Sequence, residues 1–122
     1  MQLNHLSLAV PDVQEASRFF ETFFNFRCVD SKGADVLAVL ESQGGFTLVL
    51  SHLDKEAAII YPKDFHIGFI LESQEQVLAV FERLQSAGIN LPHPPRTMRG
   101  SFTFYCRVLD TVLLEVSCLT EP

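Results

Sequence analysis

The chain contains two similar halves. The segment beginning at Asn4, NHLSLAVPDVQEASRFFETFFNF, can be aligned with the segment beginning at Phe65, FHIGFILESQEQVLAVFERLQSAGI. When His5 is placed on His66, an offset of 66 − 5 = 61 residues, the apolar positions coincide. Each segment has the pattern of a strand opened by a histidine, a short turn and an amphipathic helix. In a chain of 122 residues, this repeat predicts two copies of one supersecondary unit, neither of which can bury its apolar face alone.

The first half is predicted to have the order β-α-β-β-β. Asp12 is a favourable N-cap residue for a helix over 13–24, in which the apolar residues recur at helical spacing. Glycine-containing turns separate the strands that follow. Alternating apolar residues and β-formers predict strands over 3–10, 26–30, 36–41 and 46–52.

The second half is predicted to repeat this plan. Ser73 and Gln76 have the spacing of a capping box for a helix over 74–87, and Gly88 suits the position after its end. Prolines require an extended or irregular segment over 90–99. Strands are predicted over 66–71, 102–108 and 112–117. We therefore expect one domain over 1–122, made of a first module of about 1–53, a linker over 54–64 and a second module of about 65–119.

Composition and charge exclude several classes of function. The formal net charge of −6 argues against nucleic acids and anionic membranes as partners, because both attract basic surfaces. No apolar run is long enough to span a bilayer. The cysteines, Cys28, Cys106 and Cys118, are odd in number and form no Cys-x-x-Cys pair, so neither a disulfide framework nor a zinc ribbon is predicted. We therefore expect a reduced, cytoplasmic setting. The hydrophobic content of 48% favours a buried subunit interface, and hence a homodimer.

Three polar residues occupy apolar strand segments, where each needs a physical reason. They are His5, His66 and Glu115. Taken singly, such a histidine is more often satisfied or solvent-facing than a ligand, and Glu115 can face water. The equivalent positions of the two histidines in the repeat make coincidence a weaker explanation. Two imidazoles and one carboxylate form a recurrent mononuclear metal site and suit Zn, Mn, Fe, Co or Ni, among which the sequence does not choose.

These segments resemble a known family. The paired modules, the opening LNHLSLAVPDVQEASRFFETFFNF, the central FHIGFIL and the terminal LLEV are similar to the glyoxalase, bleomycin-resistance and extradiol-dioxygenase superfamily, also called vicinal oxygen chelate proteins. The resemblance covers nearly the whole chain. It implies an α+β fold in which two β-α-β-β-β modules form a cup-shaped, curved mixed sheet. It also implies that His5, His66 and Glu115 are metal ligands. As an anionic ligand that can shift, Glu115 is in addition a candidate catalytic base.

The chain departs from the family pattern at two places. The family often has a fourth ligand in the last strand of the first module, and laying LVLSHL on LLEVSC puts apolar Leu50 there. His52, two residues further on, is a candidate substitute, although a histidine at a strand end is usually exposed. In the turn before the last strand, only Asp110 remains of the family's usual Asp-Pro-Asp-Gly-Asn sequence. The resemblance therefore does not carry a named activity to this chain.

Further candidate residues surround this site in the implied fold. Tyr105 and Arg107 alternate on the predicted strand 102–108, so the first is a candidate catalytic residue and the second a candidate for substrate binding. The alternative that they lie on the outer face carries equal weight. Arg96 and Arg99 in the proline-rich loop are candidates for binding an anionic group, although a loop arginine is more often only solvated. Leu50 and His52 complete the predicted substrate-binding set.

Two functions remain open from the sequence. The first is a metal-dependent enzyme, a lyase, isomerase, transferase or dioxygenase, that acts on a small oxygen-bearing molecule with one divalent Zn, Ni, Mn or Fe ion as Lewis acid. The second is a metal-free protein of the bleomycin-resistance type that binds a small molecule or drug. The acidic charge, the 11 Phe residues and the altered turn favour the second function, whereas the intact His5, His66 and Glu115 set favours the first.

Overall fold

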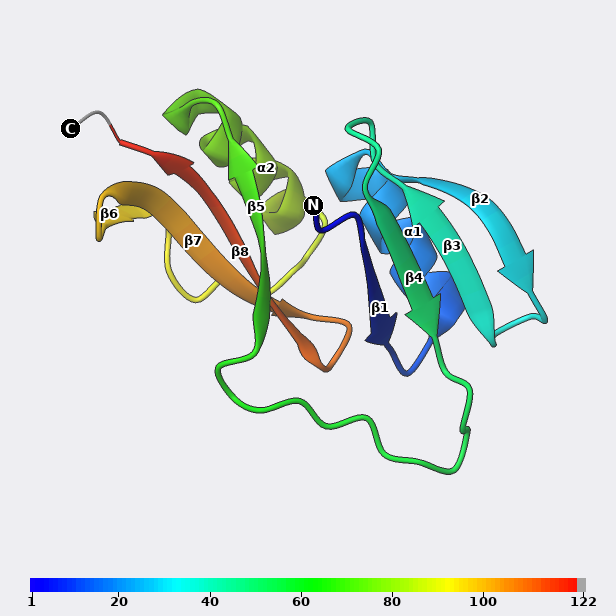
Figure 1. Ribbon diagram of the computed structural model, residues 1–122. Coiled ribbons are helices and arrows are strands. Elements are labelled where there is room, and N and C mark those ends of the chain that lie inside the picture. The colour runs from blue at the N-terminus through cyan, green and yellow to red at the C-terminus, as the bar shows by residue number, and fades with distance from the viewer. Residues whose placement is uncertain (121–122) are drawn as a thin grey trace. The chain divides into compact units, whose positions relative to one another are not determined.

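The computed structural model describes residues 1–120 and divides them into two compact units, Met1–Ile60 and the residues from Tyr61 onward (Figure 1). Each unit contains one helix and one four-stranded mixed sheet. Both units have the order β-α-β-β-β, which confirms the α+β fold of two repeated modules. Within residues 1–120, no helix combines the length and apolar character needed to cross a membrane.

The first unit has the strand order β1-β4-β3-β2. Strand β1 pairs with β4 in parallel, and the remaining pairs are antiparallel. The elements are β1 (His5–Ala9), α1 (Val13–Phe24), β2 (Arg27–Lys32), β3 (Leu37–Glu41) and β4 (Thr47–Ser51).

The second unit has the corresponding strand order β5-β8-β7-β6, with β5 and β8 parallel. The proline-rich segment predicted to be extended or irregular contains the short edge strand, which begins after the last of its prolines. The elements are β5 (His66–Leu71), α2 (Gln74–Ser86), β6 (Arg96–Met98), β7 (Ser101–Val108) and β8 (Val112–Leu119).

The predicted N-caps of both helices are confirmed, and the structure adds a C-cap at Asn25. The Asp12 side chain accepts a hydrogen bond from the backbone N–H of Glu15, 2.9 Å away, and Ser73 accepts one from the N–H of Gln76. The Gln76 side chain reaches back to the N–H of Glu72. Helix α1 ends at Asn25, which is left-handed with φ 59°, a conformation that asparagine tolerates better than most residues.

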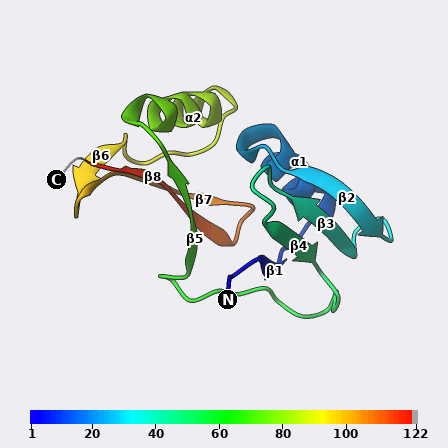
Figure 2. The ribbon, with the colours of Figure 1, turned by 45° about the horizontal axis from the view of Figure 1, so that its top comes forward.

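Each helix packs on one face of the sheet in its own unit (Figures 1 and 2). In the first unit, α1 contacts β3 and β4, and Ala16 and Phe20 on the helix are fully buried, as are Leu40 and Leu50 on the strands. In the second unit, the Phe81 ring on α2 lies 5.3 Å from that of Phe104 on β7, edge to face. Burying one such side chain contributes about 1.5–3 kcal/mol, so these contacts fix which face of each sheet points inward.

Strand alternation determines what the opposite face of each sheet presents. Because successive side chains point to opposite sides, the residues between the buried ones lie on the face that carries no helix of the same unit. On β8 the buried residues are Val112, Leu114, Val116 and Cys118, while Leu113 and Glu115 among them are half-buried. The chemistry-bearing residues of the second unit are therefore placed on this open face.

The N-terminus of α1 is held by a carboxylate from the turn after β2. Asp35 Oδ1 accepts a hydrogen bond from the backbone N–H of Val13 at 2.6 Å, and its Oδ2 lies 3.0 Å from Lys55 Nζ. The hydrogen bond from Lys55 and that from Val13 hold the pKa of Asp35 below its ordinary value. A carboxylate at this end also complements the helix dipole.

We expect Asp35→Asn to destabilise the protein by about 0.5–1 kcal/mol near neutral pH, the size typical of a helix-end charge or cap. Because the folded-state pKa is lowered, the carboxylate stabilises the fold above its unfolded-state pKa and this contribution is lost as pH falls. Urea unfolding at several pH values measures both effects, and Glu56→Gln, an exposed site, is the control. An unchanged pH dependence in Asp35→Asn would contradict the assignment.

Candidate functional site

Three strands of the second unit bring the candidate residues together. Gly68 of β5 and Tyr105 of β7 are both register partners of Glu115 on β8. One step along the same face, His66 and Arg107 are both partners of Leu113. Paired residues share a face of a sheet, so these side chains lie on the open face, opposite α2. This placement resolves the sequence alternatives for Tyr105 and Arg107 in favour of the face that carries Glu115.

The atoms of His66 and Glu115 that lie closest to each other are both hydrogen-bond acceptors. His66 Nδ1 lies 2.9 Å from the backbone carbonyl of Asp64, which can only accept, so Nδ1 carries a hydrogen and donates it. In the neutral ring, the lone pair is then on Nε2, which lies 3.8 Å from Glu115 Oε2. The two side chains are 42% and 27% exposed, so neither is fully screened by water. This arrangement is stabilised by a proton on Nε2 or by a cation between the two atoms.

Tyr105 fixes the other oxygen of the same carboxylate. Its hydroxyl donates to Glu115 Oε1 at 2.7 Å. This hydrogen bond raises the pKa of Tyr105, and desolvation and the carboxylate charge act in the same direction, against a smaller lowering by Arg99. The phenol therefore stays protonated near neutral pH and keeps donating. Glu115 is thus oriented with Oε1 toward Tyr105 and Oε2 toward His66.

Gly68 makes room for this carboxylate, and it was missed by the sequence analysis. A Cβ at position 68 would lie 3.2 Å from Glu115 Oε2, closer than most real contacts. Glycine therefore leaves the space next to Oε2 open. Gly68 lies two residues after His66, on the same face of the strand. This spacing points to Glu115 only when the parallel register of β5 and β8 is known.

The donor atoms of this pair fit a divalent metal ion. Metal bonds to imidazole nitrogen and carboxylate oxygen are about 2.0–2.2 Å long, so one ion can reach both His66 Nε2 and Glu115 Oε2 across 3.8 Å. An imidazole that donates its other N–H to a backbone carbonyl is the usual form of a metal-ligating histidine. No group of three or more His, Cys, Asp or Glu suited to hold a metal is found within residues 1–120. His66 Nε2 and Glu115 Oε2 are therefore close enough for a single ion to contact both atoms.

His5 occupies the corresponding place in the first unit. It opens β1, is exposed, and is the register partner of Thr47 on β4. Its Nδ1 lies 2.7 Å from the side-chain oxygen of Asn4. As an amide oxygen accepts, Nδ1 donates here as well, and the lone pair of the neutral ring is again on Nε2. The two repeated histidines thus share a tautomer that leaves Nε2 available as a ligand.

The register of the first sheet corrects the alignment of the fourth ligand position. Val49 is the partner of Ser7, two residues after His5, as Glu115 is the partner of Gly68, two residues after His66. Val49, and not Leu50, is therefore the counterpart of Glu115, and the sequence alignment was wrong by one residue. A shift by one residue exchanges the faces of a strand.

The corrected register places Leu50 and His52 away from the open face. Leu50 is fully buried in the core under α1. His52 follows the end of β4, and its Nδ1 donates to the backbone carbonyl of Pro11 at 3.0 Å. Its Nε2 is buried without a hydrogen-bond partner among the described residues. The positions of Leu50 and His52 are those of residues that support β4 and the turn before α1.

The three arginines differ in what they contact. Arg107 is exposed and donates from its two terminal nitrogens to the backbone carbonyls of Thr111 and Lys63, at 3.4 and 3.3 Å. Arg96 is exposed on the edge strand β6. Arg99 is exposed in the β6–β7 turn with φ 51°, and its charge reaches Tyr105. Arg107 therefore positions backbone, while Arg99 contributes positive charge near the site.

Comparisons with known proteins agree with this architecture. The family model described as the Glyoxalase/Bleomycin resistance protein/Dioxygenase superfamily matches residues 2–116. A solved structure described as a possible glyoxalase from Bacillus cereus is similar with a TM-score of 0.85 and 36% identity, over 97% of this chain and 99% of that one.

Two further relatives are more distant. An uncharacterized protein of Pseudomonas aeruginosa is 28% identical over 113 residues, which are 88% of this chain and 80% of the relative. A fosfomycin resistance protein from Listeria monocytogenes shares 24% identity and a TM-score of 0.77, over 98% of this chain and 94% of that one, which shows a common fold.

The contact between Tyr105 and Glu115 can be tested by titration. In a Tyr61→Phe background Tyr105 is the single tyrosine, so ultraviolet absorbance reports its ionisation alone. We expect the phenol to ionise above its ordinary pKa and Glu115→Gln to lower that pKa, because the carboxylate that accepts the hydrogen bond is removed. Glu75→Gln, on an exposed position of α2, is the control and should leave it unchanged. Equal pKa values in all three proteins would contradict the contact.

Proposed function

The chain belongs to the Glyoxalase/Bleomycin resistance protein/Dioxygenase superfamily, and from this membership we propose that it is a metal-dependent enzyme acting on a small oxygen-bearing molecule. Members of the superfamily often depend on a divalent metal. The observation that carries the proposal is the pair of acceptor atoms, His66 Nε2 and Glu115 Oε2, held 3.8 Å apart. Asp64 and Tyr105 engage the other atom of each group, so the pair is already oriented.

In this proposal, His66 is a neutral ligand through Nε2 and Glu115 an anionic ligand through Oε2. The bound ion, Zn, Ni, Mn or Fe, would supply Lewis acidity toward a substrate oxygen. Asp64 and Tyr105 act as supporting partners that hold the orientation of the ligands. The Asp64 carbonyl, which accepts the hydrogen of His66 Nδ1, also raises the basicity of the imidazole. His5 remains the third ligand predicted from the sequence.

Glu115, Tyr105 and Arg99 have roles in proton transfer and in the charge of the site. Glu115 is also the candidate base: its Oε2 can hold the ion or accept a proton, one at a time, and in both states the Oε1 hydrogen bond with Tyr105 can remain. Tyr105, protonated near neutral pH, is a donor and not a base. The charge of Arg99 lies on the side of Tyr105 and favours a substrate with negative character there.

The relatives do not determine the substrate. One solved structure of the same fold, from Agrobacterium tumefaciens, is described as lactoylglutathione lyase, with 17% identity and a TM-score of 0.75, and another is the fosfomycin resistance protein. One fold thus carries different activities, and the fold alone does not choose between them. The metal-free small-molecule or drug-binding protein remains the alternative to be separated by experiment, and we retain the homodimeric state and the cytoplasmic location as predictions.

We expect the purified chain, stripped with a chelator and reloaded separately with Zn, Ni, Mn and Fe, to retain one of these ions at about one per chain in elemental analysis. His66→Ala and Glu115→Gln should abolish retention because each removes a ligand. Tyr105→Phe should weaken metal affinity by about 10–100-fold, as loss of a supporting partner typically does. His5→Ala tests the predicted third ligand separately.

His93→Ala is the matched control, since His93 is exposed in the proline-rich loop. If the wild type retains a metal ion and both His66→Ala and Glu115→Gln retain it as well, His66 and Glu115 are not its ligands. A wild type that retains none of the ions after reloading would reject the enzyme as proposed and favour the metal-free binding protein.

A further inference from the structure

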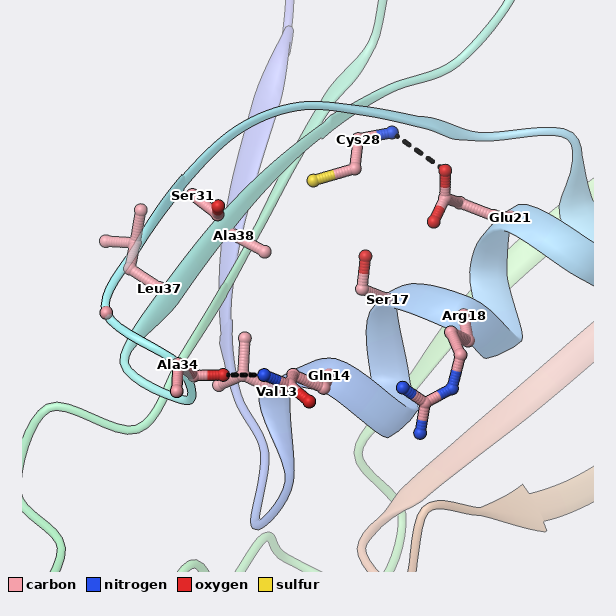
Figure 3. Close-up of a pocket in the computed structure, with 11 residues that line it drawn as sticks. Val13, Gln14, Ser17, Arg18, Glu21, Cys28, Ser31, Ala34, Leu37 and Ala38 are labelled. Atoms are coloured by element: carbon pink, nitrogen blue, oxygen red, sulfur yellow. Dashed lines mark hydrogen bonds between the residues drawn. The ribbon is translucent and has the colours of Figure 1, made fainter.

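A second site lies in the first unit, between α1 and the β2–β3 hairpin. It is a half-open pocket of about 240 Å³ (Figure 3). The pocket exists because the facing side chains are small: Cys28 and Ser31 on β2, Ala38 on β3 and Ser17 on α1. An irregularity in the β2–β3 pairing between Cys28 and Asp30 changes the alternation at this point. Such bulges redirect side chains next to functional sites.

Ser17 indicates that the pocket is built for a polar group. The residue is only 9% exposed, and Figure 3 shows its hydroxyl pointing into the pocket. Within residues 1–120, this hydroxyl makes no hydrogen bond to the protein. Ser17 Oγ is not among the atoms that are cut off from solvent, so water or a ligand in the pocket can satisfy it. The repeat-related position, 17 + 61 = 78, is Leu78, so this serine is a property of the first unit alone.

Cys28 is the cysteine whose sulfur reaches this pocket. It is half-buried, and Figure 3 shows Sγ directed into the space between helix and strand. Cys106 and Cys118 are 1% and 2% exposed, and burial raises the pKa of Cys106 to about 11. Thiol chemistry in the folded protein is therefore confined to Cys28.

The remaining lining residues define the ligand. Glu21 accepts a hydrogen bond from the backbone N–H of Cys28 through one oxygen and brings its carboxylate to the pocket, and the Gln14 side chain donates to the Ala34 carbonyl. Arg18 is exposed at the pocket and is paired with no carboxylate among the described residues. In the part of the chain that the structure describes, the donors that no protein acceptor engages are the Ser17 hydroxyl, which points into the pocket, and the Arg18 guanidinium, which Figure 3 draws turned away from Ser17. The Arg18 side chain can meet a carboxylate at the pocket by a change of rotamer. The volume is several times the roughly 30 Å³ that one water occupies in the liquid, so the pocket is large enough for a small organic group.

We propose that this pocket binds small disulfides that carry carboxylate groups and that Cys28 forms a mixed disulfide with them. The Cys28 thiol loses its proton to solvent, and Sγ attacks one sulfur of the bound disulfide. The disulfide bond of the ligand breaks as the new bond to Sγ forms. The other half leaves as a thiolate and takes a proton from solvent, so Cys28 is oxidised and the small disulfide is reduced. This site is separate from the metal proposal and shares no residue with it.

The test compares two small disulfides of similar size and opposite charge, dithiodiglycolate and cystamine. Mixed-disulfide formation on the folded wild type is followed by intact mass, with each rate divided by the rate of that probe with free cysteine. The net charge of −6 by itself favours the cationic cystamine. We expect the opposite preference, about tenfold for dithiodiglycolate, a factor within reach of one charge-assisted hydrogen bond. Peptide mapping should place the adduct on Cys28, and Cys28→Ser should abolish it.

Two variants test whether the pocket, and not only the exposure of the Cys28 thiol, determines the reaction. Arg18→Gln, at an exposed position, should remove the preference for dithiodiglycolate. Ser17→Leu introduces the residue found in the second repeat, fills the pocket, and should slow the modification, whereas Thr22→Leu on the exposed side of α1 should not. Circular dichroism checks that each variant folds. A normalised preference for cystamine, or a preference for dithiodiglycolate unchanged in Arg18→Gln, would overturn the proposal, as would adducts on Cys106 or Cys118.

Discussion

In each half of the chain, one helix packs across one face of a four-stranded sheet, and the rest of the structure depends on this contact. Once Phe20 or Phe81 is buried against its sheet, the alternation of the strands assigns every neighbouring side chain to the core or to the open face. The parallel pairing of β5 with β8 then sets Gly68 beside Glu115. A shift of that pairing by one residue would move the carboxylate into the core, where its desolvation would be costly.

The electrostatics of the open face follow from this register. Glu115 receives one strong donor, the Tyr105 hydroxyl, and its second oxygen faces a histidine whose donor is already used by a backbone carbonyl. The group is therefore oriented but incompletely satisfied. Incomplete satisfaction at a rigid, half-buried position is typical of sites that hold an ion or a substrate rather than of sites that only stabilise the fold.

Much of the fold was readable from the sequence because its signals are local. Helix spacing and the caps at Asp12 and Ser73 gave helix boundaries within one residue of those observed. His66 and Glu115 were found as polar positions in apolar strands, and Tyr105 as a further candidate on the strand predicted to lie beside them. The structure brings these three together. The errors arose where pairing between strands decides. Leu50 was aligned in place of Val49, and Gly68 was not noticed, because a register cannot be read from one strand.

By itself, the sequence determined the repeated module, the helices, the acidic charge and the identity of the polar residues available for chemistry, since all of these depend on neighbours along the chain. Only the tertiary structure decided which atom of each group is available. It assigned the donor of His66 to the Asp64 carbonyl, the donor of Tyr105 to Glu115, and an open pocket to Ser17 and Cys28. These assignments depend on backbone geometry or on contacts between segments that are distant in sequence. They are specific because the strength of a hydrogen bond falls steeply with distance and angle.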